Sequence, residues 1–211
     1  MIITSNGIES FKIQVGDFVL AFNPVAKESK FKPVRFGADI VCLSMNHPNF
    51  NGWEQTLSKN KKTFVIEGAG EYEVEGIFIK GYQVLTNYDG QERINTVYSV
   101  MLDNITLGFL GVWNSNEISN ELKEELSNVD ILFIPIGGGE VLDAADAYKL
   151  SLKLNAKLII PMHYEQIGES GALQKFLKES GNDGLKAVKK ITLKNSDLAN
   201  KEGEVVVLES E

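Results

Sequence analysis

The sequence predicts an α/β (α+β) protein in which two sheets lie between layers of helix. Short strand-like runs separated by tight turns fill the first half of the chain, and the second half alternates buried strand-like runs with helical patterns. No linker-like or low-complexity stretch interrupts the 211 residues. We therefore expect a single domain over residues 1–211.

Alternating apolar and polar residues and turn signals predict the strands of the first half. Residues 11–15 alternate, Gly16-Asp17 forms a turn into a strand at 18–22, and Asn23-Pro24 ends that strand. Apolar runs and further alternation predict the other strands of this half at 39–43, 63–66, 74–84, 96–102 and 105–110.

Helical spacing of apolar residues appears in the second half. A helix is expected near residues 118–126, with Ser119 or Asn116 as its N-cap. Two more helices are expected at 144–154 and at 172–180, where Gly181 ends the second of them. Strands are expected at 130–136, 157–161, 190–193 and 204–208.

Composition excludes several classes of protein. The net charge of −8 argues against nucleic acid and against an anionic membrane surface as partners. Cys42 is the single cysteine, so an intrachain disulfide or a multi-cysteine zinc site cannot form, and its apolar neighbours predict burial. Neither a signal peptide nor a membrane-spanning run of about 18–20 apolar residues is expected. These features favour a cytoplasmic protein, and a homo-oligomer is compatible with them.

The two histidines, His47 and His163, are the main candidates for a functional site. Each lies just past the end of a strand-like run, which is where sites of layered α/β proteins tend to lie. Imidazole is the commonest metal ligand and the usual general base near neutral pH. A turn residue at His47, or a histidine at 163 that simply hydrogen-bonds backbone carbonyls, is the structural alternative.

Seven segments taken in order resemble the metallo-β-lactamase fold, most closely the short Zn-dependent-hydrolase-like proteins related to the sugar-lactonase branch. The resemblance implies a four-layer αββα sandwich with the site at the sheet edges between its two halves. The segments are residues 18–24, 44–50, 68–74, 95–98, 109–113, 129–138 and 159–164.

The ligand motif of this family is only partly matched. The family's loop reads Ser/Thr-His-x-His-x-Asp-His, and the matching stretch here is Ser44-Met45-Asn46-His47-Pro48-Asn49-Phe50. By this resemblance, Met45 and Phe50 replace two histidines and Asn49 replaces the aspartate. Val112 replaces the bridging aspartate of a Gly-Asp element, and residues 81–88 supply no further histidine. His47 and His163 are the ligands that remain.

Zinc needs about three or four nitrogen, sulfur or carboxylate ligands, and two imidazoles alone would hold it weakly. We therefore predict that the dinuclear site and the hydrolase activity are lost and that no cofactor is bound, with zinc at His47 and His163 as the alternative. A carboxylate from Glu71, Glu73, Glu140 or Asp143 could complete such a site. Otherwise the former site repacks as a dry pocket of Met45, Asn49, Phe50, Val112 and Trp113, with Trp53 also flanking the cleft.

Three functions follow as hypotheses. The first is a binding or assembly module without catalysis. The second is a divergent metal-dependent hydrolase that acts on a small ester, lactone or phosphoester through His47 and His163. The third is an anion or nucleotide binder that uses the loops Gly68–Gly70 and Gly137–Gly139. The sequence does not identify the small-molecule ligand.

Overall fold

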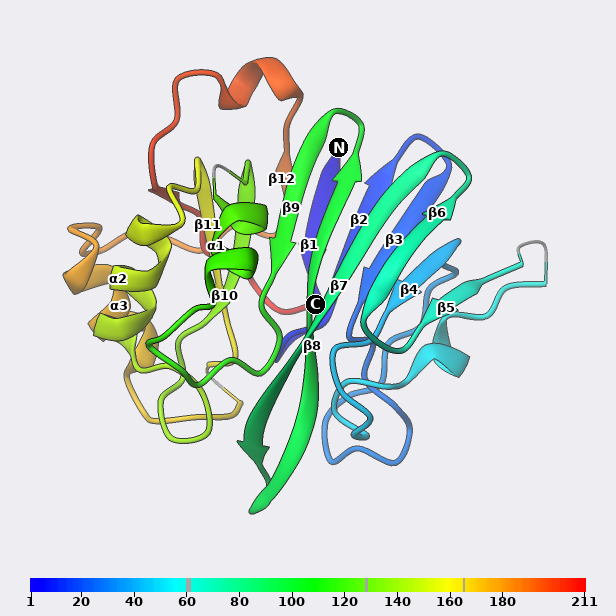
Figure 1. Ribbon diagram of the computed structural model, residues 1–211, viewed down its shortest axis with the longest axis horizontal. Helices are drawn as coiled ribbons and strands as arrows, with labels where there is room; N and C mark the ends of the chain where they lie inside the picture. Colours follow the sequence, from blue (N-terminus) through cyan, green and yellow to red (C-terminus); the bar gives the residue numbers. More distant parts are fainter. Residues whose placement is uncertain (60–61, 128, 165) are drawn as a thin grey trace.

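A computed structural model describes residues 1–59, 62–127, 129–164 and 166–211. The chain forms two mixed sheets that pack face to face (Figure 1). The first sheet has the strand order β12 (Ile191–Thr192), β1 (Ile2–Ser5), β2 (Phe11–Val15), β3 (Phe18–Phe22), β4 (Ile40–Cys42) and β5 (Phe64–Ile66). Strands β3, β4 and β5 run parallel, and the other neighbours are antiparallel.

The second sheet contains a long hairpin next to a parallel section. Its order is β13 (Glu204–Val205), β11 (Leu158–Met162), β10 (Ile131–Pro135), β9 (Ile105–Phe109), β8 (Gln91–Leu102), β7 (Ile77–Tyr88) and β6 (Gly70–Val74). Strands β9, β10, β11 and β13 are parallel. The β7–β8 hairpin extends well beyond its neighbouring strands (Figure 1).

The main core lies between the two sheets. It contains the inward-facing residues of nearly every strand, as their alternation predicts. Phe22 of β3 stacks on Phe109 of β9 with ring centroids 4.4 Å apart and an interplanar angle of 5°. Each such fully buried phenylalanine contributes roughly 1.5–3 kcal/mol of hydrophobic free energy. The packing therefore fixes the relative position of the strand ends that carry the candidate site.

Three α-helices cover the outer face of the second sheet: α1 (Asn120–Leu126), α2 (Ala144–Lys153) and α3 (Ala172–Glu179) (Figure 1). Ser119, one of the two predicted caps, accepts a hydrogen bond from the backbone N–H of Leu122 at 3.2 Å. Asp143 caps α2 in the same way by accepting from Asp146 N–H at 2.9 Å. Across the described residues, no helix combines the length and the apolar character needed to cross a membrane.

The outer face of the first sheet has a different cover. The segment 24–39 and the 3₁₀ helix η1 (Trp53–Thr56) lie over it, and Phe36 and Trp53 pack against Val19, Ala21 and Val41. A second 3₁₀ helix, η2 (Asn195–Leu198), precedes β13. The predicted sandwich is confirmed, with irregular chain and a 3₁₀ helix as its outer layer over the first sheet.

Several predicted elements differ from those observed. The strand expected at 74–84 is a hairpin, because Glu75 and Gly76 adopt positive φ angles of 54° and 77° and turn the chain between β6 and β7. Strand β1 was not expected, and β8 begins at Gln91, five residues earlier than the predicted strand at 96–102. The predicted strands at 190–193 and 204–208 shorten to two residues each.

Candidate functional site

The two histidines lie where parallel strands of each sheet end. His47 belongs to the loop that follows β4, and His163 follows β11 directly. The backbone N–H of His163 donates to Ile8 O at 2.7 Å, and its φ of 58° is in the left-handed region. A non-glycine residue held in that region costs free energy, and residues of this kind cluster at functional sites.

Two aromatic rings contact both imidazoles. Centroids of Phe50 and Tyr88 lie 5.9 and 5.1 Å from that of His47, and 6.3 and 6.0 Å from that of His163. Phe50 and Tyr88 also contact each other at 5.3 Å and are fully buried. The space shared by the two histidines is therefore filled by aromatic side chains.

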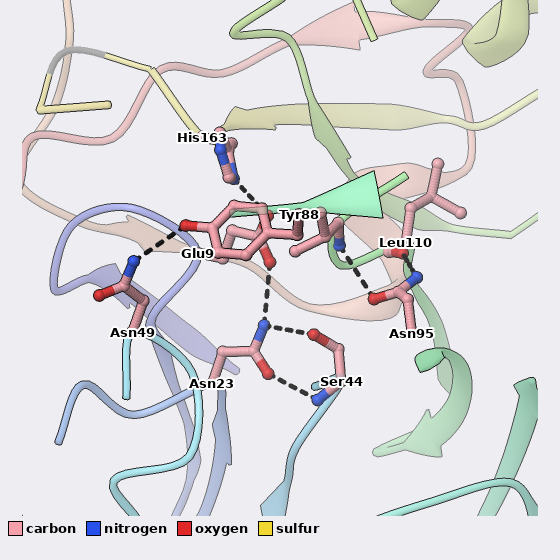
Figure 2. A network of polar contacts seen from close by, with 9 residues as sticks. Glu9, Asn23, Ser44, Asn49, Tyr88, Asn95, Leu110 and His163 are labelled. Carbon is pink, nitrogen blue, oxygen red and sulfur yellow. Dashed lines mark hydrogen bonds and ion pairs between the residues drawn. The ribbon is translucent and has the colours of Figure 1, made fainter. Parts of the chain in front are cut away.

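His163 belongs to a buried network of polar side chains (Figure 2). Its Nδ1 lies 2.6 Å from Oε1 of Glu9, and both residues are buried, at 1% and 0% exposure. The Nδ2 of Asn23 donates to Oε2 of Glu9 at 2.9 Å and to Oγ of Ser44 at 2.8 Å. Because both carboxylate oxygens of Glu9 have partners, its charge is compensated in place.

A second amide organises the loop after β9. Asn95 donates from Nδ2 to Leu110 O at 2.9 Å and accepts from Val112 N–H at 3.0 Å (Figure 2). Gly111 between them has φ 60°, and a Cβ there would come within 2.3 Å of Asn95 Oδ1. The loop is thus held with the side chain of Val112 buried beside Phe50 and Tyr88.

His47 lies at the open side of the aromatic cluster. It is half-buried, its Nδ1 accepts from Asn49 N–H at 3.2 Å, and its Nε2 lies 3.7 Å from Oδ2 of Asp89. Burial, followed by the positive charge of Arg93, lowers the pKa of His47 despite the neighbouring carboxylates. The imidazole is therefore neutral near neutral pH.

A cleft of about 350 Å³ opens above His47. Its ionisable lining is mainly acidic, with Glu28, Asp89 and Glu140 against Lys30. Glu140 accepts the backbone N–H of Asp89 at 2.6 Å, so this carboxylate supports the hairpin tip. The cleft can accept a small molecule, and Lys30 is the one lysine or arginine among its described lining residues.

The structure brings together four of the five residues expected to line the former site. Met45, Phe50 and Val112 belong to one buried cluster. Asn49 joins it by donating from Nδ2 to Tyr88 Oη at 2.9 Å, while its Oδ1 accepts from Ser29 Oγ at 2.7 Å.

Trp113, the fifth, packs into the cluster beneath the helices, and its Nε1 donates to Ser115 O. Trp53 packs on the outer face of the first sheet. The expectation that these two tryptophans flank the cleft is wrong, because neither lines the cavity at His47. Both rings instead cover apolar surface on the outer faces of the sheets.

The four carboxylates considered as replacement ligands either bind other groups or lie away from the histidines. Asp143 caps α2, and Glu140 holds the backbone of Asp89. Glu71 lines a separate cavity with Lys80 and Glu121, and Glu73 is exposed on β6. None of them pairs with both histidines in the described part of the chain.

The two glycine loops use part of their backbone hydrogen-bonding capacity within the protein, although Gly137 and Gly138 also line a cavity of about 270 Å³. Gly137 O accepts from Glu169 N–H at 2.7 Å, and Gly138 N–H donates to Leu142 O at 2.9 Å. A Cβ on Gly137 would come within 2.1 Å of His163 O, which gives a packing reason for that glycine. In the other loop, Tyr72 donates its hydroxyl to Gly68 O at 3.1 Å. These glycines allow the backbone to turn and to approach neighbouring chain closely.

Sequence reasoning missed Glu9 and Tyr88. Glu9 sits between β1 and β2 without any local motif, so only the fold brings it to His163, 154 residues away. Tyr88 had one usable signal, because Asp89-Gly90 is a typical two-residue hairpin turn and puts the preceding residue at the tip of β7. Recognition of that turn would have extended the hairpin toward the site.

Comparison with known proteins identifies the family. Residues 2–163 match the model of the beta-lactamase superfamily domain. The chain therefore belongs to the metallo-β-lactamase superfamily, as the sequence resemblance predicted.

Solved structures agree with this assignment. A proposed Zn-dependent hydrolase of the superfamily from Thermotoga maritima is 26% identical, with 98% of this chain and 97% of that chain covered and a TM-score of 0.75. A proposed metal-dependent hydrolase from Parabacteroides distasonis is 17% identical (86% and 90% covered, TM-score 0.64). Igni18, a metallo hydrolase from Ignicoccus hospitalis, is 17% identical (92% and 99% covered, TM-score 0.62). The last two support the fold alone.

Zinc, which such relatives imply, does not fit the donor set found here. Within residues 1–59, 62–127, 129–164 and 166–211, no three His, Cys, Asp or Glu side chains are grouped so that they could hold a metal ion. The phenyl ring of Phe50 contacts both imidazoles. A zinc ion needs about three or four donors at ~2.0–2.3 Å, and aromatic rings supply none.

Proposed function

We propose that this protein is a metallo-β-lactamase-fold member without metal-dependent hydrolysis that works as a binding or assembly module. The observation that carries the proposal is the pair of rings, Phe50 and Tyr88, packed between His47 and His163. Hydrolysis by the family's route needs a metal-bound water, and by the family resemblance Met45, Phe50 and Val112 replace three of the donors for that metal. Moving either ring out of the buried cluster would leave a cavity in the core, and such a cavity costs free energy.

Metal analysis of the purified protein tests this proposal. After expression with added zinc, we expect well under one equivalent of zinc, iron or manganese per chain and a melting temperature unchanged by chelator. The matched variant is His47→Ala, which removes the half-buried imidazole without disturbing the Glu9–His163 pair. Stoichiometric metal that is lost in His47→Ala would overturn the proposal.

A divergent hydrolase is the second candidate. Two observations favour it: the 26% identity to a proposed Zn-dependent hydrolase over nearly the whole chain, and a neutral imidazole at an open cleft. Its substrates would be small esters, lactones or phosphoesters. Turnover that is abolished both by chelator and by His47→Ala would establish it, whereas turnover unaffected by both would exclude it.

A further inference from the structure

A cavity larger than the cleft above His47 lies away from the histidines. It measures about 520 Å³ and borders the first sheet where segment 24–39 covers it. It shares no lining residue with the cleft above His47. The residues that line it are Asn6, Lys12, Lys32, Pro33, Val34, Arg35, Phe36 and Glu211. Its volume is in the range of small-molecule sites, about 300–1,000 Å³.

The charge of this cavity is opposite to that of the chain. Lys12, Lys32 and Arg35 contribute three cations, and Glu211 is the one acidic residue in the lining. Lys32 Nζ donates to Glu211 O at a long 3.4 Å, and no described carboxylate pairs with Lys12 or Arg35. The whole chain carries −8. A local excess of unpaired cations in an acidic protein favours an anionic ligand.

The lining also contains an aromatic surface and a polar atom without a partner. Lys12 Nζ lies 5.6 Å from the ring centroid of Phe36, and Pro33 adds a further apolar wall. Asn6 Oδ1 is buried and makes no hydrogen bond to a described residue. Such an acceptor is suited to a hydroxyl of a ligand or to a bound water.

Neighbouring side chains on the same face repeat this pattern. Thr4 is paired with Lys12 across β1 and β2, so the two side chains share a face, and Asn6 and Ser10 extend it by two residues. Thr4 Oγ1 and Ser10 Oγ are likewise buried without a hydrogen bond to the described residues, and Ser10 is 1% exposed. These two residues do not line the cavity, and their hydroxyls are suited to bound water.

We propose that this basic cavity binds a small phosphate monoester with a flat or apolar organic group. Arg35 would engage the phosphate oxygens in its two-pronged geometry, with Lys12 and Lys32 as point charges and Phe36 against the organic group. Polyanions are disfavoured, because the whole chain carries a net charge of −8. The site is independent of the strand-end cleft and of the proposed function.

Calorimetric titration with phenyl phosphate tests this proposal, with inorganic phosphate and phenol as separate arms. We expect phenyl phosphate to bind best, inorganic phosphate more weakly and phenol undetectably. Lys32→Gln and Arg35→Gln should each weaken phenyl phosphate by about tenfold, since each removes a hydrogen bond to a charged group. Glu211→Gln should strengthen it, because a repelling charge is removed.

Matched controls are available on the opposite side of the molecule. Lys153→Gln and Lys178→Gln remove exposed lysines from α2 and α3 and should leave phenyl phosphate affinity unchanged. His47→Ala should also leave it unchanged, which separates this site from the cleft. Affinity that is equal in wild type and in Lys32→Gln/Arg35→Gln, or no binding at millimolar phenyl phosphate, would overturn the proposal.

Discussion

Polar side chains have hydrogen-bond partners around the strand-end cleft at His47, whereas several of those in the basic cavity lack partners within the part of the chain that the structure describes. Beneath the open cleft at His47, Glu9 hydrogen-bonds both His163 and Asn23, and the rings of Phe50 and Tyr88 pack between the two imidazoles. At the basic cavity, Lys12 and Arg35 lack ion-pair partners among the described residues, and the space is open. Partnered polar groups indicate structure, whereas open space lined with unpartnered cations indicates a ligand. The two regions are therefore proposed to serve different purposes, and they share no lining residue.

The largest effect is expected for Glu9→Ala. Removal of Glu9 leaves the buried Nδ1 of His163 without its partner and the side chain of Asn23 bonded to Ser44 alone, so we expect a loss of roughly 3–5 kcal/mol in the free energy of unfolding. Urea unfolding followed by fluorescence measures it. The control is Glu202→Ala, an exposed glutamate that should change little. A loss equal to that of the control would mean that the network does not stabilise the cleft.

A smaller effect is expected for Tyr88→Phe. The substitution keeps the ring between the histidines but removes the oxygen that accepts from Asn49 Nδ2. A buried amide left without this partner costs about 1–3 kcal/mol. The same urea experiment applies, and the metal content should stay unchanged. Zinc uptake by Tyr88→Phe would contradict the view that ring packing excludes the ion.

The basic cavity should contribute little to stability. Lys32→Gln/Arg35→Gln removes two exposed cations, of which Lys32 makes a long 3.4 Å contact to Glu211 O, so the urea midpoint should stay within error of wild type. The urea experiment used for Glu9→Ala therefore compares the contributions of the two regions to stability. A clearly lower midpoint in the double variant would assign these cations a structural role.

The smallest effect concerns the protonation of His47. Its pKa lies below the ordinary 6.5, so the unfolded chain binds this proton more readily than the folded chain. Stability should therefore fall as the pH drops through about 6.5. In Arg93→Gln the pKa of His47 should rise, because a positive neighbour is removed. NMR signals of the imidazole followed over pH measure the pKa of His47 in wild type and in Arg93→Gln. An unchanged or lower pKa in Arg93→Gln would contradict this account.

Much of the fold could be predicted from local patterns. Strands β2, β3 and β9 follow their alternating or apolar runs closely, and α2 follows its helical spacing. The hairpin at β6 and β7 was missed because Glu75, a residue that rarely adopts positive φ, forms half of the turn. Short edge strands such as β12 carry too few residues for a pattern to be visible.

The site was predictable in part. Strand ends placed His47 and His163 near a common set of rings, and apolar residues at the ligand positions pointed to Met45, Phe50 and Val112, which share one cluster. Glu9 could not be found, since its role depends on a contact between residues far apart in sequence. Trp113 was misplaced because adjacent residues at a strand end can face different layers.

The distance in sequence between Glu9 and His163 has a kinetic consequence. These residues are separated by 154 positions, so their pairing closes a loop that includes most of both sheets. Such a contact forms late, after the strands that carry it have docked. Loss of the pair should accordingly speed unfolding while leaving the folding rate nearly unchanged, which makes this link a determinant of the native lifetime.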